Sequence, residues 1–251
     1  MLSFSGCNVP LYTKYQIKKY LSTTDKDFQD TTIKFKNIDS ALASDYSETA
    51  KIKEAVDSGV SNVEKAKENL NKQKPLEAAQ ELHLQLTNYY KDANDILSEM
   101  KIMFDFLAVA DKSANDLSES ANKLPENFDN STSKLIKEFS ENQKESNDQL
   151  EILKNQNVPD YFYQAKISLS AVLEAYSEYL TSVIKGLKQK NNRYFDVDQF
   201  VRQMDDGMSE FTDQIETIER KGEFSKRRDE LTSQEEQVNQ LISQLKSKYK
   251  I

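Results

Sequence analysis

The sequence predicts an all-α protein, an elongated antiparallel bundle of about five long, coiled-coil-like helices. Hydrophobic residues make up 37% and charged residues 30% of the 251 residues, and only five Gly and four Pro interrupt them. This composition favours long helices with solvated outer faces. Apolar or small residues recur in alternating steps of four and three, a seven-residue repeat typical of helices that pack side by side. The repeat is clearest over Leu82, Leu86, Tyr89, Ala93, Ile96, Met100, Met103, Leu107, Ala110, Ala114, Leu117, Ala121 and Leu124.

The N-terminal part of the chain predicts a short helix and then a long one. A Tyr- and Lys-rich segment from about Pro10 to Leu21 precedes Thr23 and Thr24, and a second heptad repeat then covers about residues 25–73. Polar or small residues dilute this second stripe, so we expect it to be partly solvated or loosely covered. The stripe is Phe28, Thr31, Phe35, Ile38, Leu42, Asp45, Thr49, Ile52, Val56, Gly59, Val63, Ala66 and Leu70.

The later helices follow from turn and cap signals. Pro75 ends the helix of residues 25–73, and the next helix, residues 76–123, has nearly the same length, which predicts an antiparallel hairpin. Helices opening near Pro125 and Pro159 follow, and Asp196 with Gln199 resembles a capping box that starts the last helix, with a kink at Gly222. We therefore expect residues 10–251 to form one elongated bundle behind a flexible tail of residues 1–9.

The charge of the chain argues against nucleic acid as a partner. The net charge is −8, and affinity for nucleic acid comes mainly from neutralising phosphates. The same sign argues against a generic binder of anionic membranes. We interpret the two local basic clusters as solvated helix faces: Lys14, Lys18 and Lys19, and Lys226, Arg227 and Arg228.

The sequence offers little chemistry for catalysis. Its only histidine, His83, excludes the two Glu-x-x-His pairs of a di-iron bundle and the paired histidines of a zinc protease. The five glycines are isolated, so no phosphate-binding loop is predicted. Neighbouring carboxylates such as Glu235 and Glu236 point apart on a helix, and we interpret them as solvated. We expect no enzyme activity, no cofactor and no metal site.

Four aromatic residues fall outside the main helical stripes. Tyr90, Phe106, Tyr161 and Tyr163 are expected to pack in the core, with the tyrosine hydroxyls at its rim. The alternative is a binding groove for a peptide, a glycan or an apolar ligand.

A resemblance to a known family begins at the N-terminus. Ser5-Gly6-Cys7 is similar to the end of a bacterial lipobox, although Phe4 stands where such motifs usually have Leu. A signal peptide needs an apolar stretch of about 7–15 residues, so that stretch would lie upstream of Met1. Together with the continuous helicity and the Val158-Pro159-Asp160-Tyr161 entry to an aromatic helix, the chain resembles the helical cell-wall-binding lipoproteins of Gram-positive bacteria.

The resemblance implies a non-enzymatic envelope protein on the extracellular face of the cell membrane. Cys7 would carry the lipid anchor, and the helical surface would bind cell-wall polymer or a partner protein. The alternative is a cytoplasmic coiled-coil scaffold or adaptor that binds partner helices, motivated by the diluted stripe between Phe28 and Leu70. Because the chain has one cysteine, no internal disulfide is expected.

Overall fold

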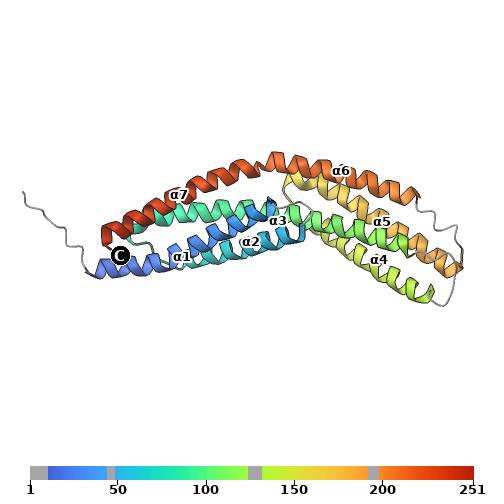
Figure 1. Cartoon of the computed structure of the whole chain (residues 1–251), viewed down its shortest axis with the longest axis horizontal. Helices are drawn as coiled ribbons and strands as arrows, with labels where there is room; N and C mark the ends of the chain where they lie inside the picture. The colour runs from blue at the N-terminus through green and yellow to red at the C-terminus, as the bar shows by residue number, and fades with distance from the viewer. Residues whose placement is uncertain (1–10, 44–48, 124–131, 192–197) are drawn as a thin grey trace, which may run out of the picture. The chain divides into compact units, whose positions relative to one another are not determined.

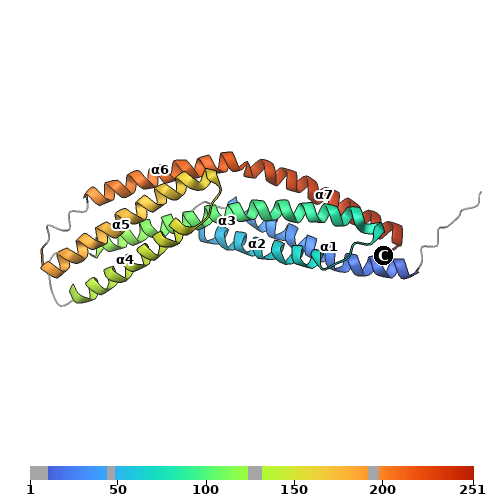
Figure 2. The same ribbon diagram turned by 180° about the vertical axis from the view of Figure 1, so that it is seen from behind.

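The all-α prediction is confirmed by a computed structural model of the chain (Figure 1, Figure 2). It describes residues 11–43, 49–123, 132–191 and 198–251. In these ranges the secondary structure is helical throughout, with short turns between the helices. The elements are α1 (Leu11–Leu42), α2 (Thr49–Asn71), η2 (Glu77–Ala79), α3 (Gln80–Asn122), α4 (Thr132–Asn155), η3 (Asp160–Phe162), α5 (Tyr163–Gln189), α6 (Asp198–Gly222) and α7 (Phe224–Tyr249).

The helices group into two compact units, where we expected one bundle over residues 10–251. Unit 1 comprises residues 1–101 and 223–251, and unit 2 comprises residues 102–222. Helix α3 contributes its first half to unit 1 and its second half to unit 2. The heptad repeat could not reveal this division, because it continues through the α3 residues at the boundary.

Unit 1 is built from α1, α2, the first half of α3, and α7, which lie side by side (Figure 1, Figure 2). Side-chain hydrogen bonds show that α7 runs antiparallel to α3, since Gln85 pairs with Gln237 and Glu99 pairs with Arg227. Helix α7 also runs antiparallel to α1, since Asp25 pairs with Lys246 and Asp39 pairs with Arg228. Large apolar side chains from all four helices fill the core: Phe28, Phe35, Ile38, Val56, Val63, Leu86, Tyr89, Leu97, Leu231 and Val238.

The expected helix of residues 25–73 is two helices, and the expected break at Thr23 and Thr24 is absent. Helix α1 continues through both threonines because the buried Thr24 hydroxyl donates to the Tyr20 carbonyl at 3.0 Å, a contact that lets threonine sit inside a helix. The break comes after Leu42 instead, and residues 44–48 lie outside the described ranges. A heptad repeat cannot distinguish one long helix from two shorter helices that pack against each other.

The stripe that polar and small residues dilute is buried within unit 1 from Phe28 to Ile38 and from Ile52 to Leu70. The expectation that it is partly solvated or loosely covered is wrong at these positions. The Thr31 hydroxyl lies 2.8 Å from both the Asp27 carbonyl and the Asn62 side chain. Gly59 is buried in α2, where a Cβ would lie 3.0 Å from Ile38 Cδ1 and 3.3 Å from Leu97 Cδ1. The polar and small residues thus allow α1, α2 and α3 to approach closely.

Unit 2 combines the second half of α3 with α4, α5 and α6. Helices α4 and α5 are antiparallel neighbours, since Asn147 of α4 pairs with Ser177 of α5 and Lys154 of α4 pairs with Glu174 of α5. The core of unit 2 is centred on α5, the most apolar of the described α-helices. The buried side chains are Phe139, Val172, Ala175, Tyr176, Tyr179, Leu180, Val183, Ile184, Leu187 and Met204.

The expected fifth long helix is also two helices. Helix α6 ends at Gly222 and α7 begins at Phe224, with Glu223 between them at φ 48° and ψ 35°. This left-handed conformation is unfavourable for a residue with a side chain. The sequence predicted a kink at Gly222, but the residue with the left-handed backbone is its neighbour Glu223.

Candidate functional site

The guanidinium of Arg228 on α7 joins several polar groups of unit 1. Its Nη2 lies 3.1 Å from Asp39 Oδ2 of α1, and its Nη1 lies 3.1 Å from Thr232 Oγ1 and 3.2 Å from Glu235 Oε1. The guanidinium carbon also lies 4.8 Å from the centre of the Phe35 ring, in the range of a cation–π contact. The N–H donors of Arg228 are therefore directed at groups of the protein itself.

The same cluster extends into the core through Glu235 and Tyr89. Glu235 is buried, with 7% of its surface exposed, and its Oε1 accepts a hydrogen bond from the Tyr89 hydroxyl at 3.2 Å. Burial, and then the Glu235 charge, raise the pKa of Tyr89, so the phenol stays protonated. Burial alone would lower the pKa of Arg228, but Asp39 and Glu235 more than offset this and raise it.

This network joins helices and offers no reactive group to a substrate. Its phenol and guanidinium stay protonated, and its carboxylates are bonded to Arg228. We call these residues, Asp39, Tyr89, Arg228 and Glu235, the charged seam network. The network links α7 to α1 through Asp39 and to α3 through Tyr89.

Sequence reasoning missed this network although a signal was present. Glu235 falls in the four–three spacing of the buried α7 residues Leu231, Val238 and Ile242, so a charge interrupts an apolar stripe. The interpretation of Glu235 as a solvated residue is wrong, whereas Glu236 is exposed. Of the cluster Lys226, Arg227 and Arg228, Lys226 is exposed as expected. The interpretation as a solvated face is wrong for Arg227, which pairs with Glu99 at 2.6 Å, and for Arg228, which belongs to the charged seam network.

His83 takes part in a side-chain contact with Tyr20. Its Nδ1 lies 3.1 Å from the Tyr20 hydroxyl, and the two rings are tilted with centroids 6.2 Å apart. Burial lowers the pKa of His83 and raises the pKa of Tyr20, which favours a neutral imidazole whose Nδ1 accepts a hydrogen bond from the protonated phenol.

The four candidate groove residues are not brought together. Tyr90 is buried in unit 1, and its hydroxyl has no hydrogen-bond partner among the described residues. Phe106 is buried in unit 2 against Phe162, with ring centroids 6.1 Å apart and an angle of 84°. Tyr161 also lies beside Phe162, and Tyr163 is 55% exposed. Tyr90 and Phe106 thus belong to the cores of different units.

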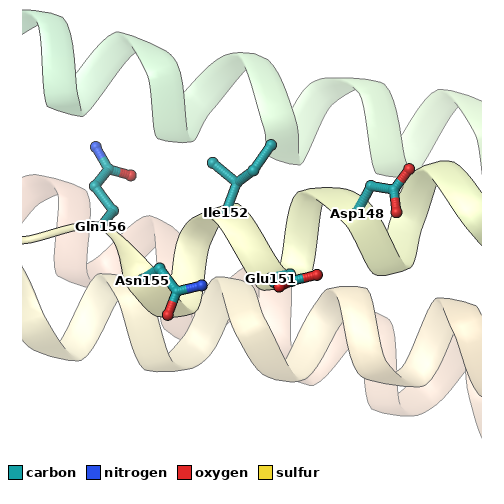
Figure 3. Close-up of a pocket in the computed structure, with 5 residues that line it drawn as sticks. All are labelled: Asp148, Glu151, Ile152, Asn155 and Gln156. Atoms are coloured by element: carbon teal, nitrogen blue, oxygen red, sulfur yellow. The ribbon is translucent and has the colours of Figure 1, made fainter.

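The surface depressions in the described part of the units include one along α4, one between α4 and α5 and one between α1 and α2. One has a volume of about 550 Å³ and lies along α4, where Figure 3 shows its lining side chains. Asp148, Ile152 and Gln156 extend from the same side of α4 in this view. Since four of the five lining residues belong to α4, the fifth, Gln156, directly follows it, and the depression is open to solvent, it encloses no ligand. The lining residues are Asp148, Glu151, Ile152, Asn155 and Gln156.

Two other depressions lie between helix pairs and are lined mostly by residues with polar side chains. One of about 370 Å³ between α4 and α5 includes Gln143, Lys185 and Lys188, and one of about 250 Å³ between α1 and α2 includes Lys34 and Glu54. In the ranges that the structure describes, no three His, Cys, Asp or Glu side chains gather where they could hold a metal ion.

The predicted lipid site cannot be placed by this geometry. Cys7 lies outside the described residues. Among the described helices, none combines the length and apolar character that a bilayer span requires. Comparison of the chain with protein-family models, curated protein sequences and solved structures finds no significant match in any of the three.

Proposed function

We propose that this chain is a non-enzymatic envelope protein that Cys7 anchors to the extracellular face of a bacterial membrane. The observation that carries the proposal is Ser5-Gly6-Cys7, in which the only cysteine of the chain follows two small residues and precedes the first residue of α1 by four positions. A diacylated residue at that position supplies the two chains needed for stable membrane attachment.

The polar groups of the described residues support a binding role over a catalytic one. The buried carboxylate Glu235 is bonded to Arg228 and Tyr89, and His83 contacts Tyr20. An acid/base pair for catalysis needs groups that can reach a substrate, and these groups face other parts of the protein. The partner would be cell-wall polymer or a protein that contacts the outer helix faces.

Intact-mass analysis of the protein isolated from its native membrane tests the anchor. We expect an N-terminus at Cys7 with the added mass of a diacylglycerol group, extraction only with detergent, and loss of both in Cys7→Ser. A mature protein that begins with an unmodified Met1 would refute the proposal. Cys7→Ser should fold normally by circular dichroism, because the substitution lies ahead of α1.

The alternative is a cytoplasmic scaffold that binds partner helices. Its motivation was the diluted stripe, and the described stripe residues from Phe28 to Ile38 and from Ile52 to Leu70 are buried within unit 1. They therefore leave no open seam for a partner helix. Sedimentation of the full chain distinguishes the two ideas, since a concentration-dependent self-association would favour the scaffold.

A further inference from the structure

The first turns of α1 expose large apolar side chains. Leu11, Tyr12 and Tyr15 are 85%, 71% and 66% exposed, the highest values among the exposed large hydrophobic residues. Positions one and four residues apart at the start of a helix fall within one broad face. The opposite face carries Ile17 and Tyr20, which are buried in unit 1. The exposed residues thus take no part in the core.

The same face is basic. Lys18 and Lys19 are exposed and Lys14 is half-buried, and no carboxylate of the described residues forms an ion pair with any of them. The first acidic residue of the chain is Asp25, so residues 1–24 carry a charge of +3 while the remainder carries −11. We name Leu11, Tyr12, Lys14, Tyr15, Lys18 and Lys19 the basic aromatic face.

We propose that the basic aromatic face rests on an anionic lipid bilayer, with its lysines at the phosphates and its Leu and Tyr side chains at the headgroup level. This inference rests on the proposed anchor at Cys7, which would hold the start of α1 beside the membrane. Tyrosine rings favour the interface because one end is apolar and the other polar. Lysine stems can cover apolar surface while their ammonium groups reach phosphate.

The negative net charge of the chain does not oppose this local contact. Attraction to an anionic surface falls off within a Debye length, about 8 Å at physiological salt. Only charges held close to the bilayer contribute, and near the anchor these are the three lysines. The exposure of Lys18 and Lys19 agrees with the interpretation of a solvated cluster, and the exposed aromatic residues beside them add the reason to expect a bilayer there.

The test tethers the full chain to vesicles through the thiol of Cys7, its only cysteine, with a maleimide lipid. The vesicles contain phosphatidylcholine alone or mixed with phosphatidylglycerol. The rate of lysine acetylation by acetic anhydride is then measured residue by residue by mass spectrometry. Because the tether is chemical, the result does not depend on whether cells acylate Cys7, which the intact-mass experiment decides separately.

We expect acetylation of Lys18 and Lys19 to slow about fivefold on vesicles with phosphatidylglycerol relative to phosphatidylcholine alone. This factor corresponds to the attraction between one lysine and an anionic membrane surface. Lys65 and Lys67 are exposed on α2 and serve as internal controls whose rates should not change. Equal rates on both kinds of vesicle would overturn the proposal. Equal slowing of Lys65 and Lys67 would also overturn it, since the whole protein would then be adsorbing.

Variants test the aromatic part of the face. In Tyr12→Ser/Tyr15→Ser we expect at least half of the protection of Lys18 and Lys19 to be lost, whereas Tyr163→Ser, which alters an exposed tyrosine of unit 2, should leave it unchanged. The substitutions lie on exposed positions, and circular dichroism checks that the helices persist. Full protection in the double variant would refute a role for the tyrosines at the bilayer.

Discussion

Replacement of Arg228 by methionine tests whether the charged seam network stabilises unit 1. Methionine keeps an unbranched apolar stem beside Phe35 but removes the guanidinium. Glu235 Oε1 would then keep only the hydrogen bond from Tyr89, at 3.2 Å. The ion pair to Asp39 would be lost as well.

The expected cost follows from the burial of the two carboxylates. Removing one partner of a fully buried pair costs about 3–5 kcal/mol. Here the side chains of Arg228 and Glu235 remain 20% and 10% exposed, and the half-exposed Asp39 adds little in water. We therefore expect Arg228→Met to lower the free energy of unfolding of unit 1 by about 2–3 kcal/mol.

Urea denaturation followed by circular dichroism measures this change, with amide hydrogen exchange to assign it to unit 1. Lys72→Met is the matched control, because Lys72 and Glu68 form an ion pair on the exposed face of the chain and its loss should not be measurable. Adding Glu235→Gln to Arg228→Met should recover stability, since a neutral amide still accepts from Tyr89. A loss in Arg228→Met no larger than in the control would refute the reasoning.

Three further substitutions probe packing, backbone strain and protonation. Gly207→Ala should lower the free energy of unfolding of unit 2 by about 1–2 kcal/mol, because a Cβ would lie 2.8 Å from Cγ2 of the buried Val172. Urea denaturation should show a smaller loss of stability when the same substitution is made in a Val172→Ala background. Glu223→Gly should stabilise the chain by about 1 kcal/mol, because Glu223 has φ 48°; unchanged or lower stability would contradict the strain. The lowered pKa of His83 predicts a contribution to stability that is complete above its ordinary pKa and is lost as the pH falls through the lowered folded value. His83→Gln should flatten that part of the stability–pH curve, and an unchanged slope would assign it to other groups.

The predictable features of the site were those set by local sequence. The isolated glycines and the single histidine led to the expectation of no catalytic centre, which stays a prediction. The sequence showed that Leu11, Tyr12 and Tyr15 belong to a Tyr- and Lys-rich segment. It did not show that they are exposed, because their exposure depends on which face of α1 the other helices cover. The groove hypothesis failed for Tyr90 and Phe106 because a residue outside an ideal heptad stripe can still be buried when a helix has neighbours on several sides.

The sequence by itself determined that the chain is helical, where α3 lies and which residues of its first half are buried. Leu82, Leu86, Tyr89 and Ala93 follow the repeat and are buried as it predicts, because helical periodicity is fixed by local backbone geometry. The tertiary structure alone decided that the chain forms two units and that Arg228 bonds Asp39, a residue 189 positions away. Such pairings depend on how helices are placed in space, and a repeat of seven residues carries no information about which stripe meets which.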